Sequence, residues 1–428
     1  MTMKRPVKFV IAGILVYVIV SLIVATKYVH FELFSRFQNS SRLMVSSNTQ
    51  SKYFNNETKY SRTRYILPIL PWTLGLSSLY NGYSRSLMFA MQEQRTIANV
   101  PFHNHGQTQE GGLRVQRSFE ETFDVKELEK LLPIVNLSEY IKHCGVVLPA
   151  QNILIPDTSI IRTKNTNVNT TLENYYKLRS LDTDYLIIIY QNTRHLYKKF
   201  LGIQLPAITD FVTDDFNRTA DCIGVFPTRD LTFSNEEELG RRIIKHWQPA
   251  AYVREMANDV FGTLCGGKYV AVHWRNKTGE RCTPINPNGK CALNAQRELI
   301  ILSRATPDIV DGVIETVRSH QLRCIYVASP PYEQLFVSSL KQKDLVVFTV
   351  MDLIGMSKKV AKYKNDNYVL SLLEQLIAEY AEVFISSRTS NWSFYVEYRR
   401  DLQKKITVAL HEIGGSSLAF TPELKNLL

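Results

Sequence analysis

The sequence predicts an α/β protein with two Rossmann-like domains that face a cleft, preceded by a single N-terminal transmembrane helix and a stem. The chain has 428 residues, which is length for about two domains. In each half, short apolar runs rich in β-branched residues alternate with helical stretches, a pattern typical of parallel sheets. One uncharged and mostly apolar stretch of 18 residues stands close to the N-terminus. These three observations carry the prediction.

The apolar stretch, residues 9 to 26, has the length of one membrane span. As a helix it would cover about 27 Å, close to the thickness of the hydrocarbon layer. Lys4, Arg5 and Lys8 precede it and only Lys27 follows closely, so the positive-inside bias places the N-terminus in the cytosol. A cleaved signal peptide is the alternative, but the stretch is long for one and a poor cleavage site follows it. We therefore expect type II topology.

The segments beyond the span follow from composition and pattern. Residues 30 to 63 are rich in Ser, Asn, Thr and Lys without an apolar period, which is typical of a solvated stem. A helical stretch at 236 to 261 separates two blocks of alternating strands and helices. We divide the chain into a cytosolic tail (1–8), a signal-anchor (9–26), a stem (27–63), an N-terminal Rossmann-like domain (64–246) and a C-terminal Rossmann-like domain (247–428).

The net charge of +11 comes from 51 Lys and Arg against 40 Asp and Glu. Residues 1 to 36 hold five of the cations and one Glu, which leaves +7 for the rest of the chain. These charges are spread without a Lys/Arg block. Such a balance suits a surface that meets an anionic small molecule or a membrane better than a dedicated nucleic-acid binder.

Sequons and cysteines agree with a lumenal location beyond the span. All six cysteines lie there, in an oxidising compartment where pairing is the default. Cys282 and Cys291 flank a Pro-Asn-Pro-Asn-Gly loop and form a candidate disulfide, the alternative being two unrelated thiols. No Cys-x-x-Cys or Cys-x-x-His spacing occurs, so we expect no metal site. Glycosylation is expected at five sequons, Asn39, Asn56, Asn136, Asn169 and Asn217.

In the N-terminal half, apolar runs predict strands and a longer amphipathic stretch predicts a helix. A polar insertion at 165 to 171 predicts a surface loop. The expected strands are 65–70, 96–101, 145–148 and 185–190, and the expected helix is 77–93.

The C-terminal half alternates more clearly. Between residues 368 and 380, Val369, Leu372, Leu373 and Leu376 follow the i, i+3, i+4 rhythm of one buried helix face. The expected strands are 268–274, 324–328, 345–350 and 382–386, and the expected helices are 307–320, 332–340, 368–380 and one from 391.

Two segments that follow expected strands predict an anion site. Four basic side chains occur within nine residues after the first strand: His273, Arg275, Lys277 and Arg281. Residues 386 to 393 form a hydroxyl-rich turn that enters a helix, whose first N–H groups and dipole favour phosphate. Each alone is explained by a solvated basic loop or a helix cap. Because both follow strand carboxyl ends in one half, we favour a nucleotide-diphosphate site.

At these residues the sequence resembles the GDP-fucose protein O-fucosyltransferase family, over roughly residues 65 to 402. The resemblance is carried by strand-His-x-Arg at 273 to 275, by Ile-Tyr-Val-Ala-Ser ending at Ser329, and by Ala-Glu-Val-Phe-Ile-Ser-Ser at 381 to 387 with Arg-Asp downstream. Looser agreement extends through Arg-Thr-Ile-Ala-Asn-Val-Pro at 95 to 101. The resemblance implies a GT-B fold, GDP-fucose held mainly by the C-terminal half, and metal-independent, inverting transfer to a Ser or Thr hydroxyl.

The resemblance also implies roles for single residues. Arg275 is the expected catalytic residue, because a bidentate guanidinium stabilises the charge that develops on the leaving β-phosphate. His273 is its expected partner, a core histidine being the alternative. The expected nucleotide-sugar site comprises Arg275, Asn276, Ser329, Ser390, Asn391 and Trp392, of which Trp392 has a core position as its alternative. Ser78 and Asn81 are expected on the acceptor side. The sequons at Asn276 and Asn391 should stay unglycosylated, since a glycan there would block the site.

Departures from the family pattern leave three readings open. Gly279 and Glu280 stand where close relatives have an Asp, and Pro330 replaces an acid after the strand that ends near 328. The chain is therefore a fucosyltransferase that uses GDP-fucose, a GT-B enzyme with another nucleotide sugar, or an inactive relative that acts as a membrane-anchored binding module. Its partners would be a GDP-sugar, a protein or glycan acceptor and the membrane, and no cofactor is expected. A Golgi membrane location is favoured over the endoplasmic reticulum, because the C-terminal Lys-Asn-Leu-Leu is no retrieval signal.

Overall fold

The fold is taken from a computed structural model of the chain. It describes residues 61–71, 76–103, 116–155, 182–207, 210–211, 216–226, 233, 235–275, 293–330, 335–387 and 390–413. The expected tail, signal-anchor and nearly all of the stem lie outside these ranges, as do Asn39, Asn56, the polar loop with Asn169, and the Cys282–Cys291 pair. Within the described part of the chain, no helix combines the length and the apolar character needed to cross a membrane.

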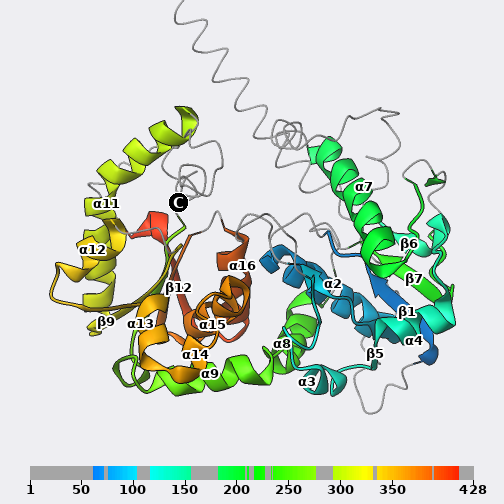
Figure 1. Ribbon diagram of the computed structural model, residues 1–428, viewed down its shortest axis with the longest axis horizontal. Coiled ribbons are helices and arrows are strands. Elements are labelled where there is room, and N and C mark those ends of the chain that lie inside the picture. The colour runs from blue at the N-terminus through cyan, green and yellow to red at the C-terminus, as the bar shows by residue number, and fades with distance from the viewer. Residues whose placement is uncertain are drawn as a thin grey trace, which may run out of the picture.

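Two five-stranded parallel sheets stand at opposite ends of the molecule, each in its own lobe (Figure 1). Because the strands are buried, they read as short apolar runs in the sequence. The N-terminal sheet has the order β5 (Ile134–Val135), β2 (Arg95–Ala98), β1 (Ser61–Pro68), β7 (Cys222–Val225) and β6 (Ile153–Leu154). The C-terminal sheet has the order β10 (Val346–Thr349), β9 (Cys324–Ala328), β8 (Val270–His273), β11 (Val383–Ser386) and β12 (Ile406–Ala409).

Helices surround both sheets, and a short antiparallel pair joins β3 (Phe102–His103) to β4 (Gln116–Arg117). The N-terminal lobe holds α2 (Leu76–Gln92), α3 (Val125–Glu129), α4 (Leu137–Cys144), α7 (Asp182–Leu201) and α8 (Glu236–His246). The C-terminal lobe holds α9 (Ala251–Phe261), α11 (Leu293–Ser319), α12 (Leu335–Lys341), α13 (Val350–Met356), α14 (Lys358–Ala361), α15 (Asn367–Tyr380) and α16 (Asn391–Leu402). The boundary expected after residue 246 coincides with the end of α8, whereas β1 begins three residues before the expected start of the N-terminal domain.

The core has two parts, separated by the C-terminal sheet. On one face, Val270, Val272 and Ile385 pack against α11 and α12. On the other, Tyr326 and Phe384 belong to a larger cluster that continues without interruption into the N-terminal lobe. The two lobes therefore share one apolar core on the inner side, while the outer side of the C-terminal sheet has its own.

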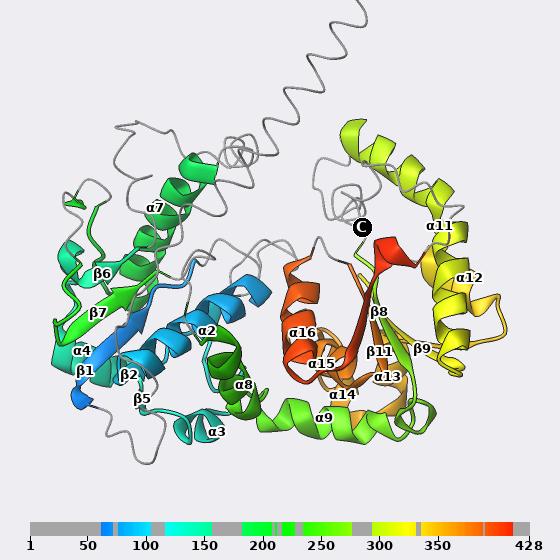
Figure 2. The same cartoon turned by 180° about the vertical axis from the view of Figure 1, so that it is seen from behind.

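The last long helix, α16, packs against α2 and α8 of the N-terminal lobe as well as against α15 (Figure 2). A buried ion pair fixes it, because the Arg399 guanidinium contacts both carboxylate oxygens of Glu379 on α15. The same guanidinium donates to the carbonyl of Trp247 at 2.7 Å, just beyond the end of α8. Coulombic attraction and hydrogen bonds from Arg399 outweigh burial and lower the pKa of Glu379. This helix thus fastens the two lobes together.

Two expected strands are not strands. Residues 145 to 148 form only an isolated bridge between Val147 and Gln204, and Val146 and Val147 are 42% and 58% exposed. Residues 185 to 190 lie inside α7. A short apolar run does not by itself distinguish a strand from part of a helix. Here the whole element is 20 residues long, which is typical of a helix and not of a strand. The helix expected at 307–320 also begins earlier, at Leu293, and continues through Pro307.

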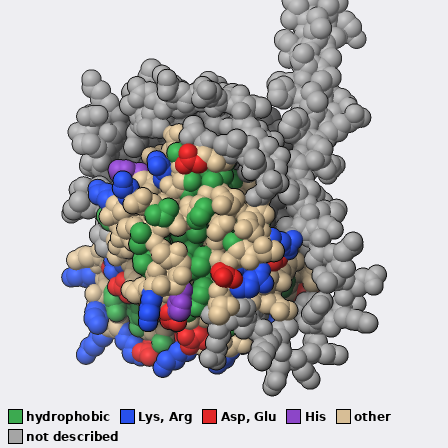
Figure 3. Space-filling view, turned by 90° about the vertical axis from the view of Figure 1, so that its right-hand side faces the viewer, with side chains coloured by type: hydrophobic (Ala, Val, Ile, Leu, Met, Phe, Trp, Pro, Cys, Tyr) green, Lys and Arg blue, Asp and Glu red, His purple; other side chains and the backbone are tan. Residues whose placement is uncertain are grey.

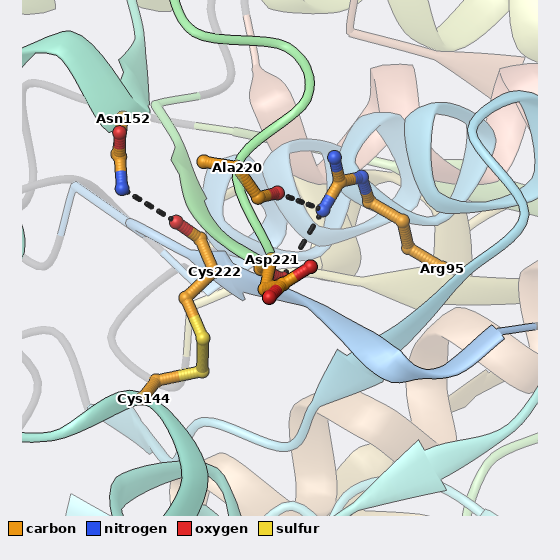
Figure 4. The surroundings of a disulfide bond; sticks show 6 residues. All are labelled: Arg95, Cys144, Asn152, Ala220, Asp221 and Cys222. Carbon is orange, nitrogen blue, oxygen red and sulfur yellow. Dashed lines mark hydrogen bonds between the residues drawn. A yellow bond between two sulfur atoms is a disulfide. The ribbon is translucent and has the colours of Figure 1, made fainter.

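Two disulfides link distant segments. Cys144–Cys222 joins the end of α4 to the start of β7, and Cys265–Cys324 joins the segment before β8 to the first residue of β9. Closing loops of 78 and 59 residues stabilises the fold by roughly 4 kcal/mol each in the chain-entropy account. Near the first disulfide, the buried Arg95 guanidinium donates to the carbonyls of Ala220 and Asp221 (Figure 4).

The described part of one face of the molecule, on the side of the N-terminal lobe, carries charges of both signs (Figure 3). Over the face shown in Figure 3, basic and acidic side chains surround exposed apolar ones. This distribution agrees with the even spread of charge along the sequence.

Candidate functional site

The strand order of the C-terminal sheet locates a candidate site. From β8 the chain first builds β9 and β10 on one side, and then returns to build β11 and β12 on the other. The order reverses between β8 and β11, and in open parallel sheets ligands bind outside the carboxyl ends of the strands at that point. Val272 of β8 pairs with Ile385 of β11, so the two strands end level with each other. His273, Arg275 and the Ser386–Ser387 pair lie at or just beyond these ends.

The N-terminus of α16 begins at the same place. Ser390 is its N-cap, and its side chain accepts a hydrogen bond from the backbone N–H of Trp392 at 3.3 Å. An N-terminal helix end presents partial positive charge and unpaired N–H groups to whatever lies beyond it. Arg275, half-buried two residues after β8, adds a full positive charge. The arrangement is therefore suited to an anion such as a diphosphate.

His273 is held from two sides. Its Nδ1 lies 2.7 Å from the hydroxyl of Ser393 in the first turn of α16, and its ring centroid lies 4.2 Å from that of Trp392. The backbone N–H of Ser387 donates to the same Ser393 oxygen at 3.1 Å. The end of β8, the end of β11 and the start of α16 thus meet around one histidine.

Trp392 connects this site to α15. It is half-buried, and its indole N–H donates to the hydroxyl of Ser371 at 3.0 Å. The Trp392 ring packs against the apolar core, as the core alternative expects, and also against His273. Its expected role in nucleotide-sugar binding stays a prediction.

The site lies where the lobes meet. The side-chain amide of Asn391 donates to the hydroxyl of Ser78, on the first turn of α2, at 2.7 Å. Beside it, the buried amide of Gln375 on α15 donates to the hydroxyl of Ser77 at 2.9 Å. Ser78, expected on the acceptor side, is therefore in direct contact with a residue expected on the nucleotide side. Asn81 lies one turn further along α2 and is half-buried.

The remaining expected site residues divide into two groups. Ser329 follows β9, and because Ala328 pairs with His273, it lies at the same edge of the sheet, half-buried. Asn276 and the Gly279–Glu280 pair lie outside the described residues. In the described ranges, no cluster of three or more His, Cys, Asp or Glu side chains could hold a metal ion.

Sequence reasoning included Ser393 in the hydroxyl-rich turn at 386 to 393 but did not single it out as a site residue, and it missed the polar residues of α15. Ser371, Glu374 and Gln375 have the i, i+3, i+4 spacing of one helix face, and they interrupt an otherwise apolar stretch, which is the signal that was available. The hydroxyl of Tyr326 on β9 donates to the carboxyl of Glu374 at 2.9 Å. Desolvation raises the pKa of Glu374 to about 8. This shift favours the protonated form of the carboxyl group.

The fold and the location of the candidate site define a class of protein: a two-lobed α/β protein with a candidate anion site at the switch point of its C-terminal parallel sheet. Residues 74–403 match the model of the GDP-fucose protein O-fucosyltransferase family, so the chain belongs to that family and is a fucosyltransferase. A comparison with curated protein sequences finds no match.

Among solved structures, POFUT1 in complex with GDP is similar with a TM-score of 0.49 and 13% identity, covering 82% of this chain and 99% of that one. POFUT1 in complex with GDP-fucose is similar with a TM-score of 0.46 and 15% identity, covering 82% and 99%. The fucosyltransferase NodZ from Bradyrhizobium is similar with a TM-score of 0.43 and 11% identity, covering 79% and 93%.

Proposed function

We propose that this protein transfers fucose from GDP-fucose to a Ser or Thr hydroxyl of a protein, or to a glycan, with inversion and without a metal ion. One observation carries the proposal: His273 at the end of β8 contacts Ser393 in the first turn of α16, at the switch point between β8 and β11. Arg275 follows β8 by two residues. Membership of the family supports GDP-fucose as the donor.

In this proposal the diphosphate of the donor lies between Arg275 and the first turn of α16. Charge develops on the β-phosphate as its bond to the sugar breaks, and a group that binds this charge more tightly in the transition state lowers the barrier. The planar fork of Arg275 suits two phosphate oxygens, and a charge-assisted hydrogen bond contributes roughly 1.5 to 3 kcal/mol. The α16 dipole adds to the same effect without any movement of charge.

The acceptor approaches from the N-terminal lobe in this proposal. Ser78 and Asn81 lie on the first two turns of α2, and the contact between Ser78 and Asn391 brings that helix against the start of α16. An acceptor hydroxyl entering beside α2 attacks the anomeric carbon from the side opposite the leaving GDP. The new C–O bond forms as the bond to the β-phosphate breaks, and the hydroxyl proton passes to solvent. Inversion is the stereochemical result of this single displacement.

We also propose a type II, lumenal arrangement in the Golgi membrane. The two disulfides support an oxidising compartment. Two of the expected glycosylation sites are exposed, Asn136 at the N-cap of α4 and Asn217 in a turn. In both, the side-chain oxygen accepts a backbone hydrogen bond, which leaves the amide nitrogen for the glycan.

A donor screen tests the function. The full-length protein would be incubated with GDP-fucose, GDP-mannose and a UDP-sugar, and both nucleotide release and sugar transfer to a mixture of secreted glycoproteins would be measured. Transfer from GDP-fucose alone, with the α-linkage that inversion of the β-configured donor produces, supports the proposal. Transfer from another sugar nucleotide instead would indicate a GT-B enzyme with a different donor. GDP binding without release or transfer from any donor selects the binding module.

A further inference from the structure

Ser393 lies at the centre of the site and is fully buried, at 0% exposure. It is on the first turn of α16, and its hydroxyl has two partners, the backbone N–H of Ser387 at 3.1 Å and Nδ1 of His273 at 2.7 Å. One partner belongs to the end of β11 and the other to the end of β8. A single oxygen atom therefore joins the two strands that flank the switch point.

The proton balance of this hydroxyl fixes the protonation of the histidine ring. The N–H of Ser387 is a donor, so it occupies a lone pair of the Ser393 oxygen. The hydroxyl proton of Ser393 therefore needs a separate acceptor. A buried donor without an acceptor is costly. Among the contacts that the structure describes for Ser393, the only available acceptor is Nδ1 of His273. The hydroxyl donates to Nδ1, and the ring proton is on Nε2.

We propose that Ser393 is a positioning residue that holds His273 as its Nε2–H tautomer, so that this nitrogen is a permanent hydrogen-bond donor for the donor diphosphate. The packed ring of Trp392 at 4.2 Å keeps the imidazole from rotating out of this orientation. The inference rests on the proposed function for the identity of the ligand. The tautomer itself follows from the buried contacts alone.

Nitrogen NMR of the ¹⁵N-histidine-labelled full-length protein tests the tautomer directly. The chain has nine histidines, and the signal that disappears in His273→Gln identifies residue 273. We expect a neutral ring with the proton on Nε2 in the wild-type protein, and loss of this single tautomer in Ser393→Ala. A proton on Nδ1 in the wild type, or an unchanged signal in Ser393→Ala, overturns the proposal.

Steady-state kinetics with GDP-fucose tests the positioning role. Ser393→Ala should lower kcat/KM for the donor by about tenfold, the scale of one hydrogen bond, while Ser393→Thr, which keeps the hydroxyl, should recover most of it. The matched control is Ser86→Ala, because Ser86 is also fully buried and its hydroxyl donates within α2 to the carbonyl of Gly82 at 3.2 Å. This control should keep wild-type kcat/KM. Equal losses in Ser393→Ala and Ser86→Ala would overturn the positioning role.

Two variants of His273 distinguish the role of its Nε2 from that of its Nδ1. The amide of Gln reaches the position of Nε2 and can always donate there, whereas the amide of Asn reaches only the position of Nδ1. His273→Gln should therefore keep a larger share of activity than His273→Asn, and the reverse order would contradict the proposal. If no GDP-sugar is transferred at all, the proposed function fails, but the NMR result still decides the tautomer.

Discussion

The amide of Asn391 donates to the hydroxyl of Ser78 across the two lobes, although 313 positions separate the residues in the sequence. Asn391 is the first residue of α16, and Ser78 is on the first turn of α2. The N-termini of these helices therefore meet at the edge of the candidate anion site. Replacing either residue removes the hydrogen bond and should change the position of the other side chain.

We expect this contact to couple the donor side of the site to the acceptor side. Asn391→Ala and Ser78→Ala should each lower kcat/KM for the acceptor several-fold, and the double variant should be little worse than either single one, because both remove the same hydrogen bond. A double-mutant cycle on kcat/KM measures this. Strictly additive losses would show that the two side chains act independently.

Arg275 is expected to act on the leaving diphosphate and not on folding. Arg275→Lys keeps the charge but loses the planar fork, so turnover should fall at least about tenfold, or roughly 1.4 kcal/mol of transition-state stabilisation. Arg275→Ala should be worse, and the melting temperature should change little in both variants. If both variants instead melted several degrees lower and the folded fraction bound GDP normally, Arg275 would have a structural role. That outcome would favour an inactive binding module over an enzyme.

GDP should bind to the full-length protein in the presence of EDTA. The positive charge of Arg275 and the start of α16 provide the attraction that a metal ion would otherwise supply. Isothermal titration calorimetry, with and without Mn²⁺ or Mg²⁺, measures the affinity. Undetectable binding at millimolar GDP, or binding only when the metal is added, contradicts the metal-free proposal.

The desolvated carboxyl of the half-buried residue Glu374 should make stability depend on pH. Desolvation raises its pKa from 4.5 to about 8 in the folded protein. Between these two values the unfolded chain is ionised while the folded protein holds the proton, so the contribution of Glu374 to stability falls as pH rises through this window. Glu374→Gln can still accept from Tyr326 but does not titrate. The melting temperature of this variant should fall less than that of the wild type between pH 5 and pH 8. An equal fall in both proteins would refute the raised pKa of Glu374.

The pattern of N-glycosylation tests both the membrane topology and the position of Asn391 in the candidate site. In a cell that glycosylates secreted proteins, Asn136→Gln and Asn217→Gln should each remove one glycan from the mass of the protein. Asn391→Gln should leave the mass unchanged, because the amide nitrogen of Asn391 is engaged by Ser78 in the folded site. Digestion of microsomes with external protease should trim only the N-terminal tail. Access of the protease to the C-terminal lobe would overturn the type II proposal.

The sequence by itself determined the elements whose signals are local. β8, β9 and β11 appear as apolar runs close to their observed bounds, and the buried face of α15 follows its periodicity. His273, Arg275 and Ser390 could be found as candidates because a site at the carboxyl end of a parallel strand adjoins that strand in the sequence. Family membership, too, was visible in these short motifs.

Only the tertiary structure decided which distant groups meet. The apolar run at 185–190 became part of the 20-residue helix α7, because a short apolar run fits either conformation and the length of the whole element distinguishes them. The pairing of Cys144 with Cys222 cannot be read from spacing, since four cysteines already allow three connectivities. The contacts of Ser393 with His273 and of Asn391 with Ser78 span 120 and 313 positions. Contacts of this range depend on how the sheets and helices pack, which no local pattern encodes.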